Sequence, residues 1–401
     1  MEKFIKLQEA IDILNKNIDP LGIEEIDLIN GVKRTIASDM YSTMNNPPFD
    51  KSAMDGYAIY SKDTINKDVR LRLIDKVYAG NYCNKELSSG EAIKIMTGAP
   101  IPKGADCVIK QEDVVVSDNF IYINRVVDKY ESICFEGEDI KKGNILVKKN
   151  KKLDYADIGI LASSGINKIK VYKKPKIAFI STGDEILDID ESIKIGQIYN
   201  SNKYSILSRI EELGYDVIGI DHSNDDIKDI GERIRKFSKY ADLIITTGGV
   251  SVGEKDLMID VIDNINGEKL FWKITIKPGS AVLCSKLNNT IIISLSGNPT
   301  ASLTTFELLV RTTLEKLSGQ SKIEIKREKA VLLNDINKKS PQNRFIRGKL
   351  VYNDAKQCVE ITQVKSGNGI LSSTINSNCL IEIPKGNNGI KSGTLVDIIK
   401  F

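Results

Sequence analysis

Two glycine-rich stretches of the sequence contain the residue types that bind phosphate. The first, TTGGVSVGEKD at residues 246–256, lies between an apolar run and an amphipathic run and contains Gly248, Gly249 and Gly253. Glycines let backbone N–H groups approach a ligand closely, and the start of a following helix offers further unpaired N–H groups. Glu254 stands where a Walker A loop has its lysine, so that motif is excluded. The stretch predicts a phosphate-binding turn, and a simple strand-to-helix turn is the alternative.

The second stretch, SGNPT at residues 296–300, has the composition of a helix start. Asn298 or Thr300 could cap the helix, and Pro299 costs little at the first helical position because its missing N–H would have no partner there. Capping alone could explain these residues, but the stretch falls at the same predicted sheet edge as the first. The candidate substrate- and phosphate-binding residues of the two stretches are Thr247, Gly248, Gly249, Ser251, Gly253, Ser296, Gly297, Asn298 and Pro299.

Carboxylates gather beside these stretches, at the ends of the predicted strands. Either Asp225 or Asp226 suits the cap of the amphipathic segment that follows them. Carboxylates next to a phosphate would repel it unless a cation lay between them, and Mg²⁺ takes one or two carboxylates together with ligand oxygens and water. The pattern predicts a metal-assisted site for a nucleotide-like ligand. The acidic residues concerned are Asp184, Glu185, Asp225, Asp226, Glu254 and Asp256.

A further acidic stretch, PPFDKSAMDGYAI at residues 47–59, lies far from these in the sequence. Its two prolines prevent a helix, and Asp50 and Asp55 are unusual for a core strand. Taken by itself, Asp55 before Gly56 is best explained as a turn former.

The rest of the composition excludes several classes of chemistry. His222 is the only histidine, so Ser-His-Asp or Cys-His catalysis would depend on this one residue and a histidine-rich metal site is impossible. The six cysteines form no CxxC pair, which favours a reducing cytosol without a zinc or redox motif.

Charge and hydropathy argue against nucleic-acid and membrane partners. The formal net charge is +3, with both signs interspersed along the chain. The N-terminus lacks the apolar centre of a signal peptide, and no apolar run approaches the roughly 20 residues that span a bilayer. We therefore expect a cytoplasmic protein without a membrane segment.

Hydrophobic periodicity divides the chain into regions of different class. Residues 4–18 predict an amphipathic helix, which the helical segment from Leu153 could rejoin, and residues 46–137 predict a small β domain. Residues 173–318 alternate apolar strands with amphipathic helices, which predicts a doubly wound, mostly parallel α/β sheet with its ligand beyond the strands' carboxyl ends. Residues 319–401 return to short strands separated by Gly and Asn turns, which predict a second small β domain, a β-barrel.

Six motifs in order resemble one known family. They are SAMDGYA (52–58), GEAIKIMTGAPIPKGAD (90–106), STGDE (181–185), TTGGVSVGEKD (246–256), IKPG (276–279) and SGNP (296–299). Together they resemble the molybdopterin molybdenumtransferases, which are related to the E domain of gephyrin. The two glycine-rich loops are also shared with the smaller molybdopterin adenylyltransferases, which lack the β domain.

The resemblance implies an architecture and a reaction. It implies a homodimer whose linker and dimerisation region comprises residues 1–45 and 138–172, with an inserted β domain at 46–137, a molybdopterin-binding domain at 173–318 and a C-terminal barrel at 319–401. It implies that adenylylated molybdopterin and molybdate give molybdenum cofactor and AMP with Mg²⁺, and that the upstream adenylyltransferase could be a partner.

The resemblance also assigns roles to individual residues. Asp55 and Thr97 would line a cleft between the α/β domain of one subunit and the N-terminal region of the other. Glu185, Asp225 and Asp256 would complete the catalytic set, with Asp226 as the alternative to Asp225. Metal would be held by Glu185 and Asp256, and Lys277 would bind an oxyanion.

Three positions depart from the usual family pattern. The family commonly has KPGKP and PGNP, whereas this chain has Ser280, Ala281 and Ser296 at the differing positions. Loss of a cation near an oxyanion leaves tungstate insertion or a specialised paralogue open. Two further functions stay open: a gephyrin-like scaffold without catalysis, and an adenylyltransferase acting one step earlier.

Overall fold

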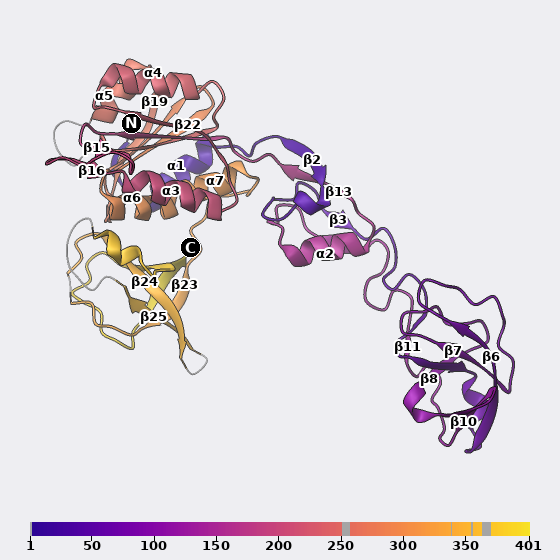
Figure 1. Cartoon of the computed structure of the whole chain (residues 1–401). Helices are drawn as coiled ribbons and strands as arrows, with labels where there is room; N and C mark the ends of the chain where they lie inside the picture. Colours follow the sequence, from indigo (N-terminus) through magenta and orange to yellow (C-terminus); the bar gives the residue numbers. More distant parts are fainter. Residues whose placement is uncertain (1, 251–256, 338, 354–355, 363–369) are drawn as a thin grey trace. The chain divides into compact units, whose positions relative to one another are not determined.

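A computed structural model describes residues 2–250, 257–337, 339–353, 356–362 and 370–401 (Figure 1). The chain forms two compact units. The large unit comprises Met1–Glu24, Lys33–Ala37 and Lys170–Phe401, and the small unit comprises Glu25–Val32 and Ser38–Ile169. Among the described residues, no helix is both long and apolar enough to cross a membrane.

A seven-stranded sheet forms the centre of the large unit, in the order β1-β19-β21-β22-β18-β14-β17. The predicted mostly parallel sheet is confirmed, since β21 alone of these described strands runs antiparallel to its two neighbours. The strands are β1 (Glu2–Ile5), β14 (Ile177–Thr182), β17 (Val217–Ser223), β18 (Leu243–Thr247), β19 (Glu268–Ile274), β21 (Val282–Leu287) and β22 (Thr290–Leu295).

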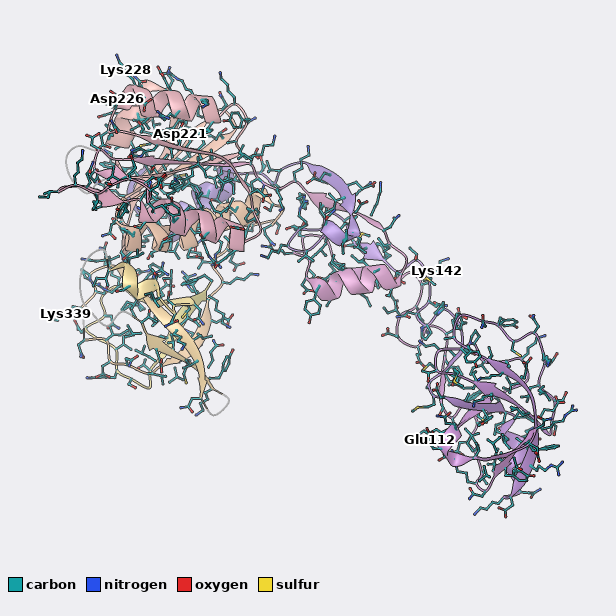
Figure 2. The ribbon with its side chains drawn as sticks, in the orientation of Figure 1. Glu112, Lys142, Asp221, Asp226, Lys228 and Lys339 are labelled. Atoms are coloured by element: carbon teal, nitrogen blue, oxygen red, sulfur yellow. The ribbon has the colours of Figure 1, made fainter. Side chains whose placement is uncertain are left out.

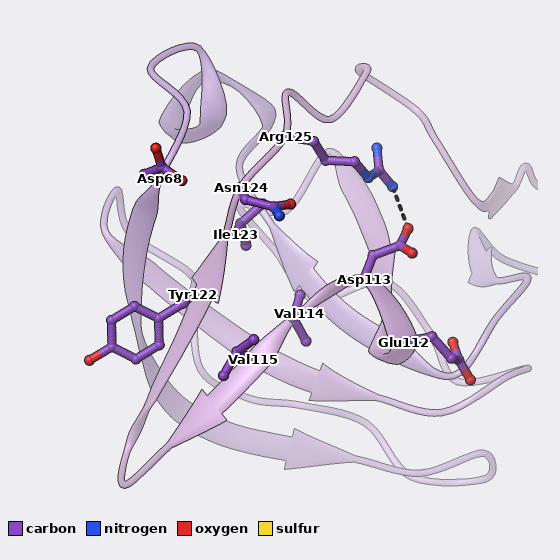
Figure 3. A pocket seen from close by; sticks show the side chains of 9 residues that line it. All are labelled: Asp68, Glu112, Asp113, Val114, Val115, Tyr122, Ile123, Asn124 and Arg125. Atoms are coloured by element: carbon purple, nitrogen blue, oxygen red, sulfur yellow. Dashed lines mark hydrogen bonds and ion pairs between the residues drawn. The ribbon is translucent and has the colours of Figure 1, made fainter.

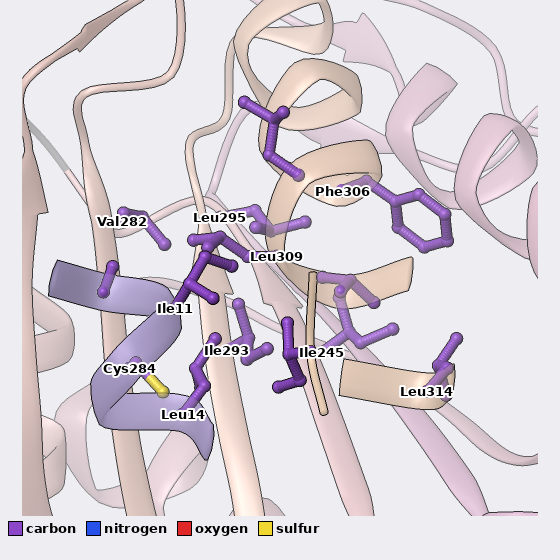
Figure 4. Packing of buried hydrophobic residues seen from close by; sticks show 14 of the residues in the cluster. Ile11, Leu14, Ile245, Val282, Cys284, Ile293, Leu295, Phe306, Leu309 and Leu314 are labelled. Carbon is purple, nitrogen blue, oxygen red and sulfur yellow. The ribbon is translucent and has the colours of Figure 1, made fainter. Parts of the chain in front are cut away.

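Helices cover both faces of this sheet because successive strand residues point to opposite sides. Ile245 and Ile293 belong to the core on one face, together with Leu14 (Figure 4), while Ile244 and Ile292 belong to the core on the other. The first face carries α1 (Leu7–Asn17), α3 (Ser201–Glu212), α6 (Pro299–Thr305), the π-helix η4 (Phe306–Val310) and α7 (Arg311–Leu317). The second carries α4 (Ile227–Phe237) and α5 (Leu257–Asn264).

The N-terminal segment lies in a different part of the fold from the one predicted for residues 1–45. Strand β1 pairs in parallel with β19, and Ile11 and Leu14 of α1 are buried in the core of the large unit. Helix α2 (Tyr155–Ser163) belongs to the small unit, where it packs on β12 (Ile145–Val147) and the 3₁₀ turn η1 (Leu28–Asn30), whereas α1 belongs to the large unit. The apolar stripe of α1 is buried here because it completes the face of the sheet beside β19.

The C-terminal region is a closed barrel, as predicted. Five strands follow one another in the order β24-β25-β23-β27-β26, and β26 pairs again with β24. Closure leaves no free edge among these described strands, and Ala330, Val359, Ile381 and Ile398 fill the interior. The strands are β23 (Glu328–Leu332), β24 (Asn343–Asn353), β25 (Lys356–Ile361), β26 (Cys379–Ile383) and β27 (Leu395–Lys400), and η5 is Leu371–Thr374.

The small unit contains a six-stranded sheet in the order β8-β5-β7-β6-β10-β9. Its core includes Tyr57, Ile59 and Ile109. The strands are β5 (Gly56–Ile59), β6 (Val69–Val77), β7 (Glu91–Ile95), β8 (Cys107–Lys110), β9 (Val115–Ser117) and β10 (Phe120–Ile123), with η2 (Ser61–Thr64) and η3 (Gln111–Asp113). Short ladders pair β3 (Met40–Tyr41) with β12, β4 (Lys51–Ser52) with β11 (Ile133–Cys134) and β2 (Ile23–Asp27) with β13 (Lys168–Tyr172).

Candidate functional site

Four loops lie at one edge of the large sheet because β22, β18, β14 and β17 are parallel. The strand order places the loops in the sequence 296–298, 248–250, 183–185 and 224–226 along that edge. Open α/β sheets bind ligands beyond the carboxyl ends of their strands. The predicted loops therefore come together in space, although they are far apart in the sequence.

The two glycine-rich loops contact each other. Gly248 and Gly249 have φ of +95° and +66°, which favours glycine. A Cβ on Gly248 would lie 2.3 Å from the Thr182 carbonyl oxygen and 2.6 Å from its hydroxyl, and one on Gly297 would lie 3.7 Å from the Gly248 Cα. The Gly248 N–H donates to the Leu295 carbonyl at 3.2 Å. The two loops therefore approach each other through backbone atoms, and Gly297 is exposed at this approach.

The 296–300 loop has the capping role that its composition predicted. Asn298 Oδ1 accepts hydrogen bonds from the N–H groups of Thr300 and Ala301 at 3.1 and 3.3 Å, and Pro299 occupies the first turn of α6. The Ser296 hydroxyl in turn accepts from the Asn298 N–H at 3.2 Å. These bonds fix the conformation of the 296–300 loop. The same residues therefore cap α6 and form one side of the proposed phosphate cradle.

Buried polar atoms without partners flank the two loops. Within the described ranges, Thr182 Oγ1, Asn202 Oδ1 and Thr300 Oγ1 have no hydrogen-bond partner, although Asn202 Nδ2 donates to the Gly297 carbonyl at 2.8 Å. A buried unpaired polar group is costly and often marks a place for a ligand or water. Thr182 of STGDE and Asn202 were missed by sequence reasoning, since only the glycines and acids of these segments carried a recognisable signal.

The alternative between Asp225 and Asp226 is decided by their contacts. Asp226 Oδ1 caps α4 by accepting from the Asp229 N–H at 2.8 Å. Figure 2 labels Asp226 at this end of α4. Burial, and then the negative charges of Asp184 and Glu185, raise the pKa of the Asp225 carboxyl. Asp225 is therefore the member of the pair that faces the other acids.

The STGDE turn brings its glutamate back toward the strand. Gly183 has φ of +136°, and a Cβ there would lie 2.6 Å from Glu185 Oε2. The Asp184 carboxylate accepts the Asp225 N–H at 3.2 Å, which connects this turn to the loop after β17. Asp184, Glu185 and Asp225 thus form one acidic cluster beside the glycine-rich loops.

The carboxylates of this cluster can bind a hard cation such as Mg²⁺ only if water or substrate oxygens supply the remaining ligands. Among the described residues, no three acidic, histidine or cysteine side chains are arranged to hold a metal ion by themselves. Mg²⁺ commonly takes one or two carboxylates and completes its shell with water and substrate phosphate. Glu185 and Asp225 can supply such a pair. Burial, and then the charges of Asp184 and Glu185, raise the pKa of Asp225, and a cation would offset the charge part of this effect. Ser251, Gly253, Glu254 and Asp256 lie outside the described residues.

Lys277 is exposed at the same edge and has a cationic neighbour. It lies in β20 (Ile276–Lys277), just after β19, and it is in register with Arg344 of the barrel strand β24. Arg344 Nε is buried and has no partner within the described ranges. Arg344 was missed by sequence reasoning because the register of a barrel strand cannot be read from local sequence.

The turn after Lys277 packs against α6. Gly279 has φ of +100°, and a Cβ there would lie 2.9 Å from the Thr305 hydroxyl. The departures from the family pattern, Ser280 and Ala281, lie in this turn; Ala281 is buried in the core under α4 and α5. Ala281 therefore has a packing role. Ser280 stands where the family commonly has a lysine, so the additional cation beside Lys277 is Arg344.

The described part of the chain contains a cavity in each unit. The cavity in the large unit measures about 290 Å³ and lies at the ends of β14 and β17; its lining residues are Ser181, Ile186, Leu187, Asp188, Glu191, Asn200, Lys203, Ile220, Asp221 and His222. The cavity in the small unit measures about 450 Å³ and lies beside β9 and β10 (Figure 3), where Arg125 is paired with Asp113. None of the predicted site residues that the structure describes lines either of them.

Asp55 and Thr97 come together in the small unit. The N–H and the hydroxyl of Thr97 both donate to Asp55 Oδ1, at 2.7 Å each. These bonds lower the pKa of the exposed Asp55 carboxyl.

Asp50 has a local role, since its Oδ1 accepts the Glu136 N–H at 2.8 Å. Gly56 is required because a Cβ would lie 2.0 Å from the Ile109 carbonyl oxygen. Asp55 is thus an oriented, exposed carboxylate rather than only a turn former.

Comparison with known proteins covers nearly the whole chain. Residues 5–165 match the MoeA N-terminal region (domains I and II), residues 178–316 a probable molybdopterin-binding domain and residues 329–401 the MoeA C-terminal region (domain IV). The molybdopterin molybdenumtransferase of Staphylococcus aureus (strain COL) is 34% identical over 403 residues, with 98% of this chain and 95% of the relative covered.

Solved structures agree with this match. The crystal structure of the molybdopterin biosynthesis moeA protein from Pyrococcus horikoshii OT3 is 31% identical, with a TM-score of 0.82 over 99% of this chain and 100% of the other. A second crystal structure of a moeA protein from that organism gives 32% identity and a TM-score of 0.80, with 99% of each chain covered. On sequence and fold together, the chain belongs to the MoeA family of molybdopterin molybdenumtransferases.

Proposed function

We propose that the protein inserts molybdenum into adenylylated molybdopterin and releases molybdenum cofactor and AMP. Membership of the family supports a transferase of molybdenum cofactor biosynthesis. The observation that carries the finer proposal is the edge of the large sheet, where glycine-rich loops adjoin a cluster of acids. That combination suits a ligand with a phosphoric anhydride.

The chain's own residues would hold and orient the anhydride. The backbone of Gly249 and Gly297 would contact phosphate oxygens, with Thr182 and Thr300 as hydroxyl donors. Gly248, whose N–H is bonded to the Leu295 carbonyl, would shape the turn. Ser251 and Gly253 are proposed members of the same cradle. Water would then attack the adenylyl phosphorus and form the new P–O bond of AMP. The P–O bond to the pterin phosphate breaks, the pterin phosphate leaves with its electron pair, and the proton of the water passes to solvent. Fixed donors at that phosphate favour the transition state.

Mg²⁺ is the proposed divalent cation, and Glu185, Asp225 and Asp256 are the proposed carboxylates around it. When bound, it would neutralise charge on the anhydride and on the released AMP. Glu185 and Asp225 lie beside the glycine-rich loops and would keep the adenylyl end aligned.

Lys277 and Arg344 are the proposed oxyanion-binding cations. They lie in register on neighbouring strands, which places two positive charges near one another after β19. The dithiolene sulfurs of the pterin must meet the oxyanion here, so no protein cysteine or histidine is needed as a metal ligand. Tungstate remains the alternative to molybdate, since Ser280 replaces a lysine of the family pattern.

The proposed assembly is a homodimer in which Asp55 and Thr97 complete the partner's site. The two hydrogen bonds from Thr97 fix the orientation of the Asp55 carboxylate. Because Asp55 is exposed, this carboxylate is accessible to the partner subunit's site. An upstream adenylyltransferase is the proposed donor of the ligand.

The test is a reaction with defined components. Purified protein is incubated with adenylylated molybdopterin, Mg²⁺ and either molybdate or tungstate, and AMP and metal-loaded cofactor are quantified by chromatography. We expect both products to form together and to require the oxyanion. Stable ligand binding without AMP release under every condition would refute the transferase proposal and favour a binding or scaffold protein.

A further inference from the structure

The cavity in the small unit has no part in the proposed reaction. It is formed by η3, by the hairpin of β9 and β10 and by Asp68, the residue before β6 (Figure 3). Its volume of about 450 Å³ falls within the range of roughly 300–1,000 Å³ that is typical of small-molecule sites. The cavity is therefore a candidate site for a second ligand.

Apolar side chains form the middle of this cavity. Ile123 is buried in the core of the small unit and Val114 packs against that core, so the positions of both are fixed. Val115 and Tyr122 lie opposite each other in the ladder of β9 and β10 and are 68% and 41% exposed. A ligand in this cavity would remove their apolar surface from water and must therefore have a hydrocarbon part.

The arginine of the lining contributes no uncompensated positive charge. Arg125 Nη2 lies 3.0 Å from an Asp113 carboxylate oxygen and 2.6 Å from a Glu131 carboxylate oxygen. Arg70 of β6 stacks on the Phe120 ring, 3.7 Å from its centroid, and is not part of the lining. The lining therefore offers no free cation to an anionic ligand.

Two carboxylates of the lining are, in contrast, without a cationic partner. Within the described ranges, Asp68 and Glu112 form no ion pair, and Glu112 accepts only a hydrogen bond from Gln111 Nε2 at 3.3 Å. Figure 3 shows Asp68 and Glu112 on opposite sides of Val114 and Val115. The cavity thus has a negative charge at each end and an apolar middle.

This arrangement does not suit a metal ion. The two free carboxylates are separated by apolar side chains, and no three acidic, histidine or cysteine side chains among the described residues are arranged to hold a metal. A ligand with two separated positive charges and a hydrocarbon chain between them matches the lining instead.

We propose that this cavity binds an aliphatic polyamine. One ammonium group pairs with Asp68 and another with Glu112, while the methylene groups between them pack on Val114 and Val115. The Tyr122 ring adds an aromatic face for an ammonium group. The site belongs to the small unit alone, so it is independent of the reaction proposed at the sheet edge of the large unit.

Removal of one charge at a time tests the proposal. Binding of spermidine to the full chain is measured by isothermal titration calorimetry at low ionic strength, where charge interactions are least screened. We expect Asp68→Asn and Glu112→Gln each to weaken binding roughly threefold to fivefold, as the loss of an exposed ion pair does. Asp118→Asn is the matched control, since Asp118 is an exposed acid of the same hairpin that does not line the cavity.

The backbone of these positions tolerates the substitutions. Asp68 and Asp118 have φ of +63° and +50°, a region in which asparagine is as acceptable as aspartate. A difference between the two asparagine variants therefore reports on the ligand rather than on folding.

A second pair of variants tests the location with the same net charge change. Val115 and Val116 are neighbours in β9, are 68% and 50% exposed and point to opposite faces, and only Val115 lines the cavity. Val115→Lys should weaken spermidine binding by its repulsion of the ammonium groups, whereas Val116→Lys should bind like wild type. Hexylamine, with one ammonium group on a similar hydrocarbon chain, should bind wild type more weakly than spermidine does.

Three results would overturn the proposal. Equal weakening by Asp68→Asn and Asp118→Asn, or by the two lysine variants, would show diffuse attraction to an acidic surface rather than a site in the cavity. Hexylamine that binds as tightly as spermidine would remove the requirement for two charged ends. No measurable binding of spermidine to wild type would refute the site outright, and each of these results would leave the proposed transferase function untouched.

Discussion

At the scale of single residues, Gly248 carries the sharpest steric demand of the site. Gly248→Ala should abolish AMP release, because the new Cβ would lie 2.3 Å from the Thr182 carbonyl oxygen and force the cradle open. The left-handed backbone alone costs an alanine about 1–2 kcal/mol. Gly196→Ala is the matched control, since Gly196 has a similar φ of +92° with nothing within 4 Å of a Cβ among the described residues. Comparable activity in the two variants, measured as AMP formed, would argue against the cradle.

The two neighbouring aspartates should separate function from capping. Asp225→Asn should slow AMP release by roughly a hundredfold, because it removes a charge from the acidic cluster proposed to face the anhydride. It should not lower the melting temperature, since burial and the charges of Asp184 and Glu185 already oppose ionisation of Asp225. Asp226→Asn should retain activity, because asparagine caps a helix as well as aspartate does. If Asp226→Asn released AMP more slowly than Asp225→Asn, Asp226 would be the functional acid and Asp225 would not.

Local sequence located the acids and glycines but not all their partners. Both Asp225 and Asp226 precede a helix, and only the bond from the Asp229 N–H identifies Asp226 as the cap. The pairing of Asp55 with Thr97 joins residues 42 positions apart, so their proximity could be expected only from the family resemblance. Arg344 had no signal at all, because its place beside Lys277 depends on barrel register.

At the scale of elements, the short parallel ladder of β15 (Ile186–Leu187) and β16 (Ile198–Tyr199) adjoins one important carboxylate. The bonds from Lys203 and Tyr204 of α3 lower the pKa of Asp188 to about 2. A lowered pKa means that this contribution to stability is complete above the ordinary value of 3.8 and is lost as pH falls toward 2. Asp188→Asn should therefore cost about 0.2–1 kcal/mol at pH 7, because the pair is partly exposed.

Urea unfolding at several pH values checks this window. The difference in unfolding free energy between wild type and Asp188→Asn should be constant from pH 7 to about 5 and should shrink below about pH 4. A difference that grows on acidification would show that Asp188 is not held ionised by Lys203 and Tyr204.

The placement of α1 gives a second prediction at this scale. Leu14 is fully buried in the core of the large unit. Leu14→Ala should therefore destabilise that unit by about 2–5 kcal/mol. Hydrogen exchange should rise in β19 and β22, whereas Leu161→Ala in α2 should raise exchange only in the small unit. Faster exchange of residues 138–172 in Leu14→Ala would instead favour the linker assignment.

Element types were predictable because their periodicities are local, whereas their neighbours were not. The alternation of apolar strands and amphipathic helices indicated the sheet, and turn residues with short strands indicated the barrel. Strand β1 was not predicted, because its partner is β19, at Glu268–Ile274 in the far half of the chain. The ladder of β15 and β16 beside the cavity of the large unit was also missed, since two-residue strands leave no periodic signal.

At the scale of the whole molecule, the proposed dimer predicts complementation between two inactive variants. Asp55→Asn and Asp225→Asn should each be nearly inactive alone. If Asp55 of one chain completes the site of the other, mixed dimers contain one intact site, and an equal mixture should recover roughly a quarter of wild-type AMP release. Subunits are mixed after mild dissociation and assayed for AMP. No recovery despite verified heterodimers would place Asp55 and Asp225 in the site of the same chain.

The parallel pairing of Glu2–Ile5 with residues Phe271–Ile274 has a consequence for synthesis of the chain. Residues 2–17 emerge from the ribosome long before β19, their partner strand. Until β19 is synthesised, the apolar stripe of α1 has no sheet to pack against. The six-stranded sheet of the small unit finds all its pairing partners between residues 56 and 123. The sheet of the small unit can therefore fold before β19 is synthesised. The seven-stranded sheet of the large unit, which needs both β1 and β19, would be completed last.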